Sequence, residues 1–151
     1  WSNDDGCAVN HALYIASSSG HVEIVRILLE KKNIDVNKQN EDGVTPLFIS
    51  SQKDHVEIVT LLLSLPNIDV NLSMPNGASP LIIGCYLGHA SCVKQLLSHS
   101  NIDTTLVFQE QTAFHWCQSD SRADGWEFLE SNINVEGRVK IVQLLTEAGA
   151  Q

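Results

Sequence analysis

The pentapeptide NIDVN occupies residues 33–37 and recurs, letter for letter, at residues 67–71. A degenerate third copy, NIDTT, occupies residues 101–105. The three copies begin at Asn33, Asn67 and Asn101, so the interval between successive copies is constant. A segment that returns at a constant interval of roughly 20 to 50 residues is typical of a protein that stacks copies of one structural unit. The interval therefore predicts a repeat architecture.

Two further segments follow the same period. The stretch HVEIVRILL at residues 21–29 recurs as HVEIVTLLL at 55–63 and, more loosely, as HASCVKQLL at 89–97 and RVKIVQLL from residue 138. Ahead of each copy lies another recurring segment, and its four copies keep the period to within one position, beginning at His11, Thr45, Ser79 and Thr112. The sequence thus contains four successive units.

The unit that begins at Thr45 shows the local chemistry most clearly. Thr45 is a suitable N-cap, and Pro46 is a suitable first helical residue because the missing N–H would have no helical acceptor there. We expect a short helix from Pro46 to about Gln52. In other units glycine marks the turn that follows, at Gly20 and Gly88. The apolar residues of the second helix fall on one helical face, at Ile58, Val59, Leu62 and Leu63.

An extended segment follows each predicted helix pair. Pro66 ends the second helix, the β-branched NIDVN segment extends the chain, and the Asp42-Gly43 and Asn76-Gly77 pairs favour tight turns. Each unit is therefore expected to consist of two short antiparallel helices and a hairpin-like finger. Such a unit is too small to bury its own apolar face, and stacking on a neighbour buries it.

These features resemble the ankyrin repeat family, whose units combine a turn, a Thr-Pro-Leu helix start, a Gly-His link and an Ile-Val-x-Leu-Leu second helix. The resemblance covers about residues 10–150. It implies an all-α fold, an α-solenoid of stacked ankyrin repeats with β-hairpin-like fingers. It also implies a single domain over residues 1–151, with repeats at about 10–38, 39–73, 75–107 and 108–151.

The fourth unit departs from the family pattern by an insertion. The two helices of the third unit are expected to start nine positions apart and those of the fourth 25 apart, which leaves 16 extra residues within 118–136. The inserted segment includes three large apolar residues, Trp126, Phe128 and Leu129. A long insertion on a rigid scaffold is often functional, although repeat arrays also tolerate insertions that have no function.

Composition narrows the range of functions. The 151-residue chain has 18 acidic and 9 basic side chains and a net charge of −9, which opposes nucleic-acid binding and favours a basic protein surface as partner. The sequence has no apolar run near the ~20 residues that span a bilayer, so we predict no membrane insertion. We also predict no secretory signal, since the N-terminus has no basic region followed by an apolar one. The four cysteines are expected to stay reduced, as in the cytoplasm or the nucleus.

No catalytic residue, metal site or cofactor is predicted. Cys85, His89 and Cys92 have a Cys-x3-His-x2-Cys spacing, but structural zinc normally needs four ligands. The repeat register instead makes Cys92 a small buried residue and His89 part of the helix link. His115 and Cys117 are two positions apart in one short helix, so their side chains point to different faces. The sequence has no phosphate-binding or dinucleotide-binding glycine motif.

The resemblance implies a non-catalytic protein–protein interaction module, whose protein or peptide partner docks on a concave face of fingertips and first helices. Carried over by register, the partner-binding positions are Glu41, Val44, Gln52, Lys53, Met74, Asn76, Tyr86, Leu87, Phe108 and Gln109. The alternative function is a structural or regulatory ankyrin segment of a longer multidomain protein, such as a channel or an enzyme.

Several of these positions are apolar in the third and fourth units. Tyr86, Leu87 and Phe108 stand where the second unit has polar side chains. Exposed apolar patches mark interaction sites, and aromatic side chains dominate binding energies, so we expect an exposed interface here. The other interpretation is that Phe108 and Leu106 fold under the insertion, which covers them.

Asn37 and Asn71 are predicted sites of modification. They occupy the finger-entry position that ankyrin repeats present to an asparaginyl hydroxylase, each eight residues beyond a leucine. A structural role is the alternative, because an asparagine at this position caps and ties the hairpin whether or not it is modified.

Overall fold

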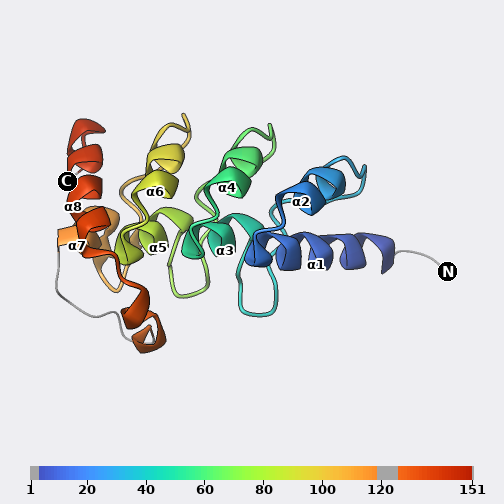
Figure 1. Ribbon diagram of the computed structural model, residues 1–151, viewed down its shortest axis with the longest axis horizontal. Coiled ribbons are helices and arrows are strands. Elements are labelled where there is room, and N and C mark those ends of the chain that lie inside the picture. Colours follow the sequence, from blue (N-terminus) through green and yellow to red (C-terminus); the bar gives the residue numbers. More distant parts are fainter. Residues whose placement is uncertain (1–3, 119–125, 151) are drawn as a thin grey trace.

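The computed structural model describes residues 4–118 and 126–150, and its helices form four pairs that lie side by side in one row (Figure 1). The first helices of the pairs are α1 (Asp4–Ser19), α3 (Pro46–Gln52), α5 (Pro80–Leu87) and α7 (Ala113–Gln118). The second helices are α2 (Val22–Leu29), α4 (Val56–Leu63), α6 (Ala90–Leu97) and α8 (Val135–Glu147). First helices contact first helices and second helices contact second helices along the row. The predicted α-solenoid is confirmed.

The predicted helix starts are confirmed at the two Thr/Ser-Pro positions. The Thr45 Oγ1 accepts a hydrogen bond from the Phe48 N–H at 3.1 Å, and the Ser79 Oγ accepts one from the Ile82 N–H at 3.2 Å. Proline is the first residue of both α3 and α5. These caps satisfy N–H groups that have no partner inside the helix, so the two helices begin where the sequence places them.

The turn between the helices of a pair uses a left-handed residue. Gly20 has a φ of 75° and Gly88 a φ of 81°, as the sequence predicts. Asp54, which holds the equivalent position of the second unit, adopts a φ of 59° without being glycine. Its carboxylate accepts a hydrogen bond from the Cys92 Sγ at 3.2 Å, which ties the second unit to the third.

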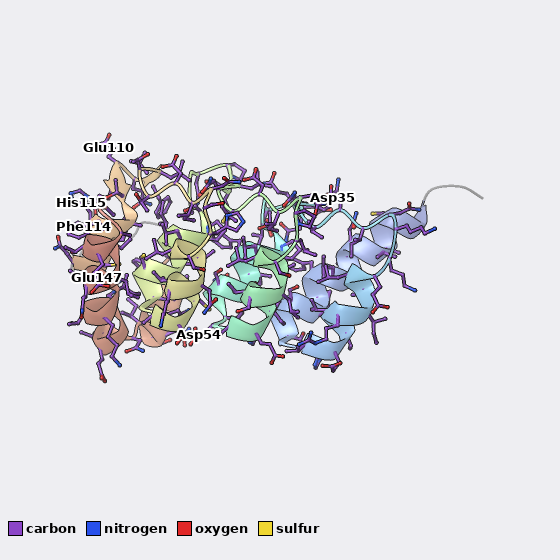
Figure 2. All side chains as sticks on the ribbon, turned by 90° about the horizontal axis from the view of Figure 1, so that it is seen from above. Asp35, Asp54, Glu110, Phe114, His115 and Glu147 are labelled. Atoms are coloured by element: carbon purple, nitrogen blue, oxygen red, sulfur yellow. The ribbon has the colours of Figure 1, made fainter. Side chains whose placement is uncertain are left out.

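The extended segments between the pairs form the predicted fingers. Backbone hydrogen bonds close two of the tips, from the Asn40 N–H to the Val44 carbonyl at 3.0 Å and from the Met74 N–H to the Ala78 carbonyl at 2.9 Å. The last finger contains two short antiparallel strands, β1 (Val107–Phe108) and β2 (Gln111–Thr112). Figure 2 shows Asp35 and Glu110 toward the edge that the extended segments form and Asp54 toward the opposite edge.

The recurring NIDVN segment ties neighbouring units together through its last asparagine. The Asn37 side chain donates to the Asn67 carbonyl and accepts from the Asp69 N–H, both at 2.8 Å. Asn71 makes the same two bonds one unit later, to the Asn101 carbonyl at 2.7 Å and from the Asp103 N–H at 2.8 Å. Each tie needs an asparagine at the same place in its unit, which accounts for the recurrence of the last residue of the pentapeptide at Asn37 and Asn71.

The last unit attaches to the third by a different set of contacts. In the earlier units a histidine ring nitrogen bonds a carbonyl of the preceding first helix, His55 to Ser18 at 3.1 Å and His89 to Ser51 at 2.9 Å. Arg138 occupies the histidine position in the fourth unit, and its Nε donates to the Tyr86 carbonyl at 2.7 Å.

The start of α8 packs directly against the link of the third unit. The Asn134 side chain caps α8 by accepting from the Gly137 N–H at 2.9 Å, and the backbone N–H of Asn134 donates to the Leu87 carbonyl at 2.7 Å. A Cβ added at Gly137 would lie 1.7 Å from the Gly88 carbonyl oxygen. Both glycines are therefore required for this close approach.

A 3-10 helix, η1 (Glu127–Asn132), precedes α8 and carries the described part of the insertion. Trp126 and Leu129 are buried there and join the continuous apolar core. Residues 119–125 of the predicted insertion and the side chain of Phe128 lie outside the described part of the chain.

Candidate functional site

A hollow of about 390 Å³ lies between the first two finger tips, α3 and α5, and we call it the central hollow. Its lining residues are Asp42, Val44, Phe48, Gln52, Met74, Asn76, Ile83 and Trp126. Four of them, Val44, Gln52, Met74 and Asn76, are positions that the sequence predicts as partner-binding. The structure thus brings predicted positions from two successive units to one cavity.

The central hollow has an apolar floor and a polar rim. Val44, Phe48 and Ile83 are buried and form the floor, because they sit on the core-facing sides of the finger, α3 and α5. Gln52 and Met74 are half-buried, and Asp42 and Asn76 are exposed at the finger tips. A cavity that combines an apolar base with a few polar groups is typical of a binding site.

Side chains of the finger tips hold the rim in place. The Asn40 Oδ1 accepts from the N–H groups of Asp42 and Val44, at 3.0 and 2.9 Å. The Asn76 Oδ1 accepts from the Ala78 N–H at 3.0 Å. Both tips turn through a left-handed glycine, and a Cβ at Gly43 would lie 2.3 Å from the Pro75 Cδ of the next finger. Neighbouring finger tips are thus in contact, and the rim is fixed by backbone geometry.

A second hollow of about 500 Å³ lies between α1 and the first finger, and we call it the first hollow. Its lining residues are Cys7, Asn10, His11, Tyr14, Lys38, Gln39, Asn40, Glu41 and Asp42. Asp42 lines both hollows, so they adjoin at the tip of the first finger. Partial burial raises the pKa of the Tyr14 phenol, and the negative charge of Asp42 raises it further.

The expected exposure of Tyr86, Leu87 and Phe108 is wrong. These side chains are 0%, 1% and 2% exposed. Trp126 from the insertion covers Tyr86 and Phe108, because its ring stacks on Phe108 at a centroid distance of 4.5 Å and meets the edge of Tyr86 at 5.0 Å. The alternative interpretation, in which the insertion folds over this part of the concave face, is the one that the structure bears out for Phe108.

An aromatic cluster therefore occupies the place of the predicted patch. Trp116 of α7 completes it, with its indole N–H donating to the Phe108 carbonyl at 3.1 Å. Its centroid lies 5.6 Å from Tyr86 and 5.7 Å from Phe108. The Arg138 guanidinium carbon lies 5.1 Å from the centre of the Tyr86 ring, a cation–π contact. Trp126 is thus a wall of the central hollow that the predicted site residues do not include, and the only signal in the sequence was an aromatic residue inside the insertion.

The remaining predicted positions are exposed but lie apart from the central hollow. Glu41 lines the first hollow. Lys53 follows α3 directly and is exposed. Gln109 lies at the tip of the last finger, between β1 and β2, where it is exposed.

The cysteine and histidine residues that were considered for a metal site or for catalysis are not gathered at one metal site in the described part of the chain. Within residues 4–118 and 126–150, no group of three or more His, Cys, Asp or Glu side chains is placed to hold a metal ion. Burial raises the pKa of the Cys92 thiol, with its hydrogen bond to Asp54 as the second cause. Burial likewise raises the pKa of the Cys85 thiol, followed by a hydrogen bond with Cys117. The His115 Nδ1 pairs with the Thr112 hydroxyl at 2.8 Å.

The side-chain amides of Asn37 and Asn71 both form the hydrogen bonds that connect neighbouring units. Their hydroxylation stays a prediction. No helix in the described part of the chain is both long and apolar enough to cross a membrane.

Comparison with known families agrees with this geometry. A family model described as ankyrin repeats (3 copies) matches residues 2–74, and a model described as ankyrin repeat matches residues 76–106. Together the two matches cover more than half of the chain. No curated protein matches the sequence.

Proposed function

The chain belongs to the ankyrin repeat family, whose repeats serve protein–protein interaction, and we propose that it binds a partner protein through the central hollow and the first hollow. The observation that carries this proposal is the central hollow itself. It combines a buried apolar floor with exposed polar groups at the rim, on a face that the finger tips keep rigid. The apolar floor supplies affinity, and the rim supplies specificity.

The lining of the central hollow supports a non-catalytic role. Asp42 is the one ionisable side chain among the residues that line the central hollow. An acid–base pair, or a nucleophile with its activating base, needs two groups within hydrogen-bonding reach of the reacting atoms. Ankyrin repeats are generally non-catalytic, and the protein acts by binding.

A second candidate function is that of a structural or regulatory segment within a longer protein. The observation in its favour is the exposure of apolar side chains on the outer helices at both ends of the row. Ile24 and Ile27 of α2 are 48% and 58% exposed, and Val135 and Val139 of α8 are 70% and 69% exposed. The two residues of each pair lie three or four positions apart on one helix and so form one exposed apolar patch, and such patches mark contacts with another protein surface.

We also propose the cytoplasm or the nucleus as the compartment. All four cysteines are free thiols, and three of them, Cys85, Cys92 and Cys117, are buried in the core. A buried thiol that packs as a small apolar residue suits a reducing compartment.

The binding proposal is tested with a matched pair of substitutions. Gln52 of α3 and Gln95 of α6 are both half-buried glutamines, but only Gln52 lines the central hollow. The wild type, Gln52→Arg and Gln95→Arg are immobilised, and the proteins that each captures from a native lysate are quantified by mass spectrometry. We expect Gln52→Arg to lose partners that the other two retain, because the arginine fills the hollow. Equal capture by all three folded proteins overturns the proposal.

A further inference from the structure

We propose that the two adjoining hollows hold one extended peptide segment of the partner, with a basic side chain in the first hollow and a large apolar side chain in the central hollow, about three residues apart. This inference rests on the proposed function and adds to it the chemistry of the partner. Three observations carry it, namely the adjacency of the hollows, the different character of their linings and their separation.

The two hollows adjoin at the tip of the first finger, and we call the pair the groove. They lie on the two sides of the first finger tip and share Asp42 as a common wall. The next finger tip, with Met74 and Asn76, bounds the central hollow on the far side. Trp126, which also lines the central hollow, stacks on Phe108 at 4.5 Å. Apart from Trp126, the residues that line the two hollows belong to the first three units.

The first hollow suits a basic side chain. Glu41 and Asp42 supply two carboxylates, and Tyr14 supplies an aromatic ring beside them. Carboxylates and an aromatic face together are the surroundings in which a guanidinium or ammonium group is most stable in proteins. Lys38 is the one lysine or arginine of the lining, beside the histidine His11, so the carboxylates of Glu41 and Asp42 outnumber the one permanent cation. The overall charge of −9 acts in the same direction and attracts a basic segment.

The central hollow suits a large apolar side chain. Its buried floor residues, Val44, Phe48 and Ile83, expose no polar group of a side chain to an occupant. Met74 and the Trp126 ring form adaptable side walls, since methionine fits irregular shapes and an indole offers a broad apolar face. A volume of about 390 Å³ accommodates a leucine, methionine or phenylalanine side chain together with its solvent.

The separation follows from the packing of the helices. The first hollow lies between α1 and the first finger, and the central hollow lies between α3, α5 and the first two fingers, so the two are about one unit apart along the row. Adjacent packed helices are about 8 to 10 Å apart. An extended peptide advances about 3.3 Å per residue. One unit therefore corresponds to about three residues of the bound segment, in either chain direction.

The test uses peptides selected without assuming a sequence. A random peptide library displayed on phage is selected on the whole 151-residue chain. We expect the enriched peptides to carry Arg or Lys three residues before or after Leu, Met or Phe. Enrichment of acidic peptides, of peptides without this spacing, or of none at all overturns the inference.

The most enriched peptide is then measured on two variants that change the net charge equally, by isothermal titration. Asp42→Asn keeps the shape of the side chain and suits the turn before Gly43, and Glu147→Gln makes the same change on α8, far from the groove (Figure 2). We expect Asp42→Asn to weaken binding about fivefold, as for a partly exposed ion pair, and Glu147→Gln to leave it unchanged. Equal binding by both variants overturns the inference.

The Gln52→Arg variant separates this inference from the proposed function. If Gln52→Arg abolishes peptide binding while Asp42→Asn does not weaken it, the groove is the binding site and the assignment of a basic side chain is wrong. If Gln52→Arg binds the peptide as the wild type does, the groove is not the site, and both proposals fail.

Discussion

Two adjacent residues at the tip of the last finger have left-handed backbones without being glycine. Gln109 has a φ of 49° and Glu110 a φ of 64°, between the paired residues Phe108 and Gln111. A two-residue hairpin turn with positive φ at both positions favours Asn-Gly or Asp-Gly. Side chains with a Cβ are strained there by roughly 1–2 kcal/mol per residue.

Glu110→Gly is therefore expected to stabilise the protein. Relief of strain exceeds the entropy that glycine adds to the unfolded chain, which leaves a gain of about 0.5 to 1 kcal/mol in the free energy of unfolding. Urea denaturation followed by circular dichroism measures it. Glu110→Ala removes the same exposed carboxylate but keeps the Cβ, so its stability should stay near that of the wild type. If both variants gain equally, removal of the charge is the cause and the strain argument is wrong.

Individual residues could be predicted where a side chain has one local task. Thr45, Pro46 and Gly88 behave as the sequence predicts, because capping and positive φ depend on a few neighbouring atoms. The residue type of Asp54 does not indicate a left-handed turn, but its register with Gly20 and Gly88 does. Arg138 could be aligned with the link histidines, but its bond to the Tyr86 carbonyl depends on the path of the insertion.

The packing of α8 on the third unit depends on one close approach, that of Gly137 to the backbone of Gly88. Gly137 lies in the first turn of α8, where alanine would ordinarily stabilise the helix by about 1 kcal/mol. Its added Cβ would, however, meet the backbone oxygen of Gly88 at 1.7 Å, and backbone atoms cannot move aside cheaply.

Gly137→Ala is therefore expected to destabilise the protein by about 3 kcal/mol or more, in the upper range for an overpacked contact. Tryptophan fluorescence during urea unfolding measures the effect, since Trp116 and Trp126 lie where the last two units meet. Gly149→Ala is the control, because nothing lies within 4 Å of its Cβ and only the strain of a φ of 79° remains. A Gly137→Ala protein as stable as the wild type would contradict the close packing of α8 on the third unit.

The insertion marks the limit of what the period of the sequence can predict. Val44, Gln52, Met74 and Asn76 belong to the regular units, and the structure places all four in one hollow. Tyr86 and Phe108 also belong to regular units, but their exposure depends on what covers them. Trp126 comes from a segment outside the period, so no equivalent position in another unit indicates where its ring packs.

Across the whole chain, the stacked core buries thiols that the unfolded chain exposes. Burial raises the pKa of Cys85 and Cys92 above their ordinary values in the folded protein. Below about pH 8 both states keep these thiols protonated, so the stabilisation is complete. As pH rises through about 9, the unfolded chain loses these protons and the folded chain does not, which lowers the free energy of unfolding.

We expect each such thiol to contribute a decrease of up to about 1.4 kcal/mol per pH unit above pH 9. Urea unfolding at pH 7.5, 8.5 and 9.5 measures the slope, and Cys92→Ala should make it shallower. Val93→Ala is the matched control, because it truncates the equally buried neighbour in α6 without removing a thiol. If both substitutions leave the slope unchanged, the buried thiols do not cause the alkaline loss of stability.

The architecture as a whole follows from the constant interval between the repeated segments, because a unit that cannot bury its own apolar face must stack in the same way each time. The groove follows from the same argument, since the finger tips repeat with the helices. The identity of the partner does not follow from the interval, because the residues that line the groove differ from one unit to the next.

The asparagine and histidine ties have a consequence for how the gene for such a chain can change. Asn37 and Asn71 hold the following unit by identical bonds, and the link residues Gly20 and Gly88 are interchangeable in conformation. Excision of residues 38–71 as one piece would bring Asn37 to the position of Asn71, with the Asn101 carbonyl and the Asp103 N–H in reach. Loss or duplication of one whole segment of this length thus rejoins compatible surfaces, whereas a cut that removes only part of the segment between Asn37 and Asn71 shifts the following residues out of register with their partners.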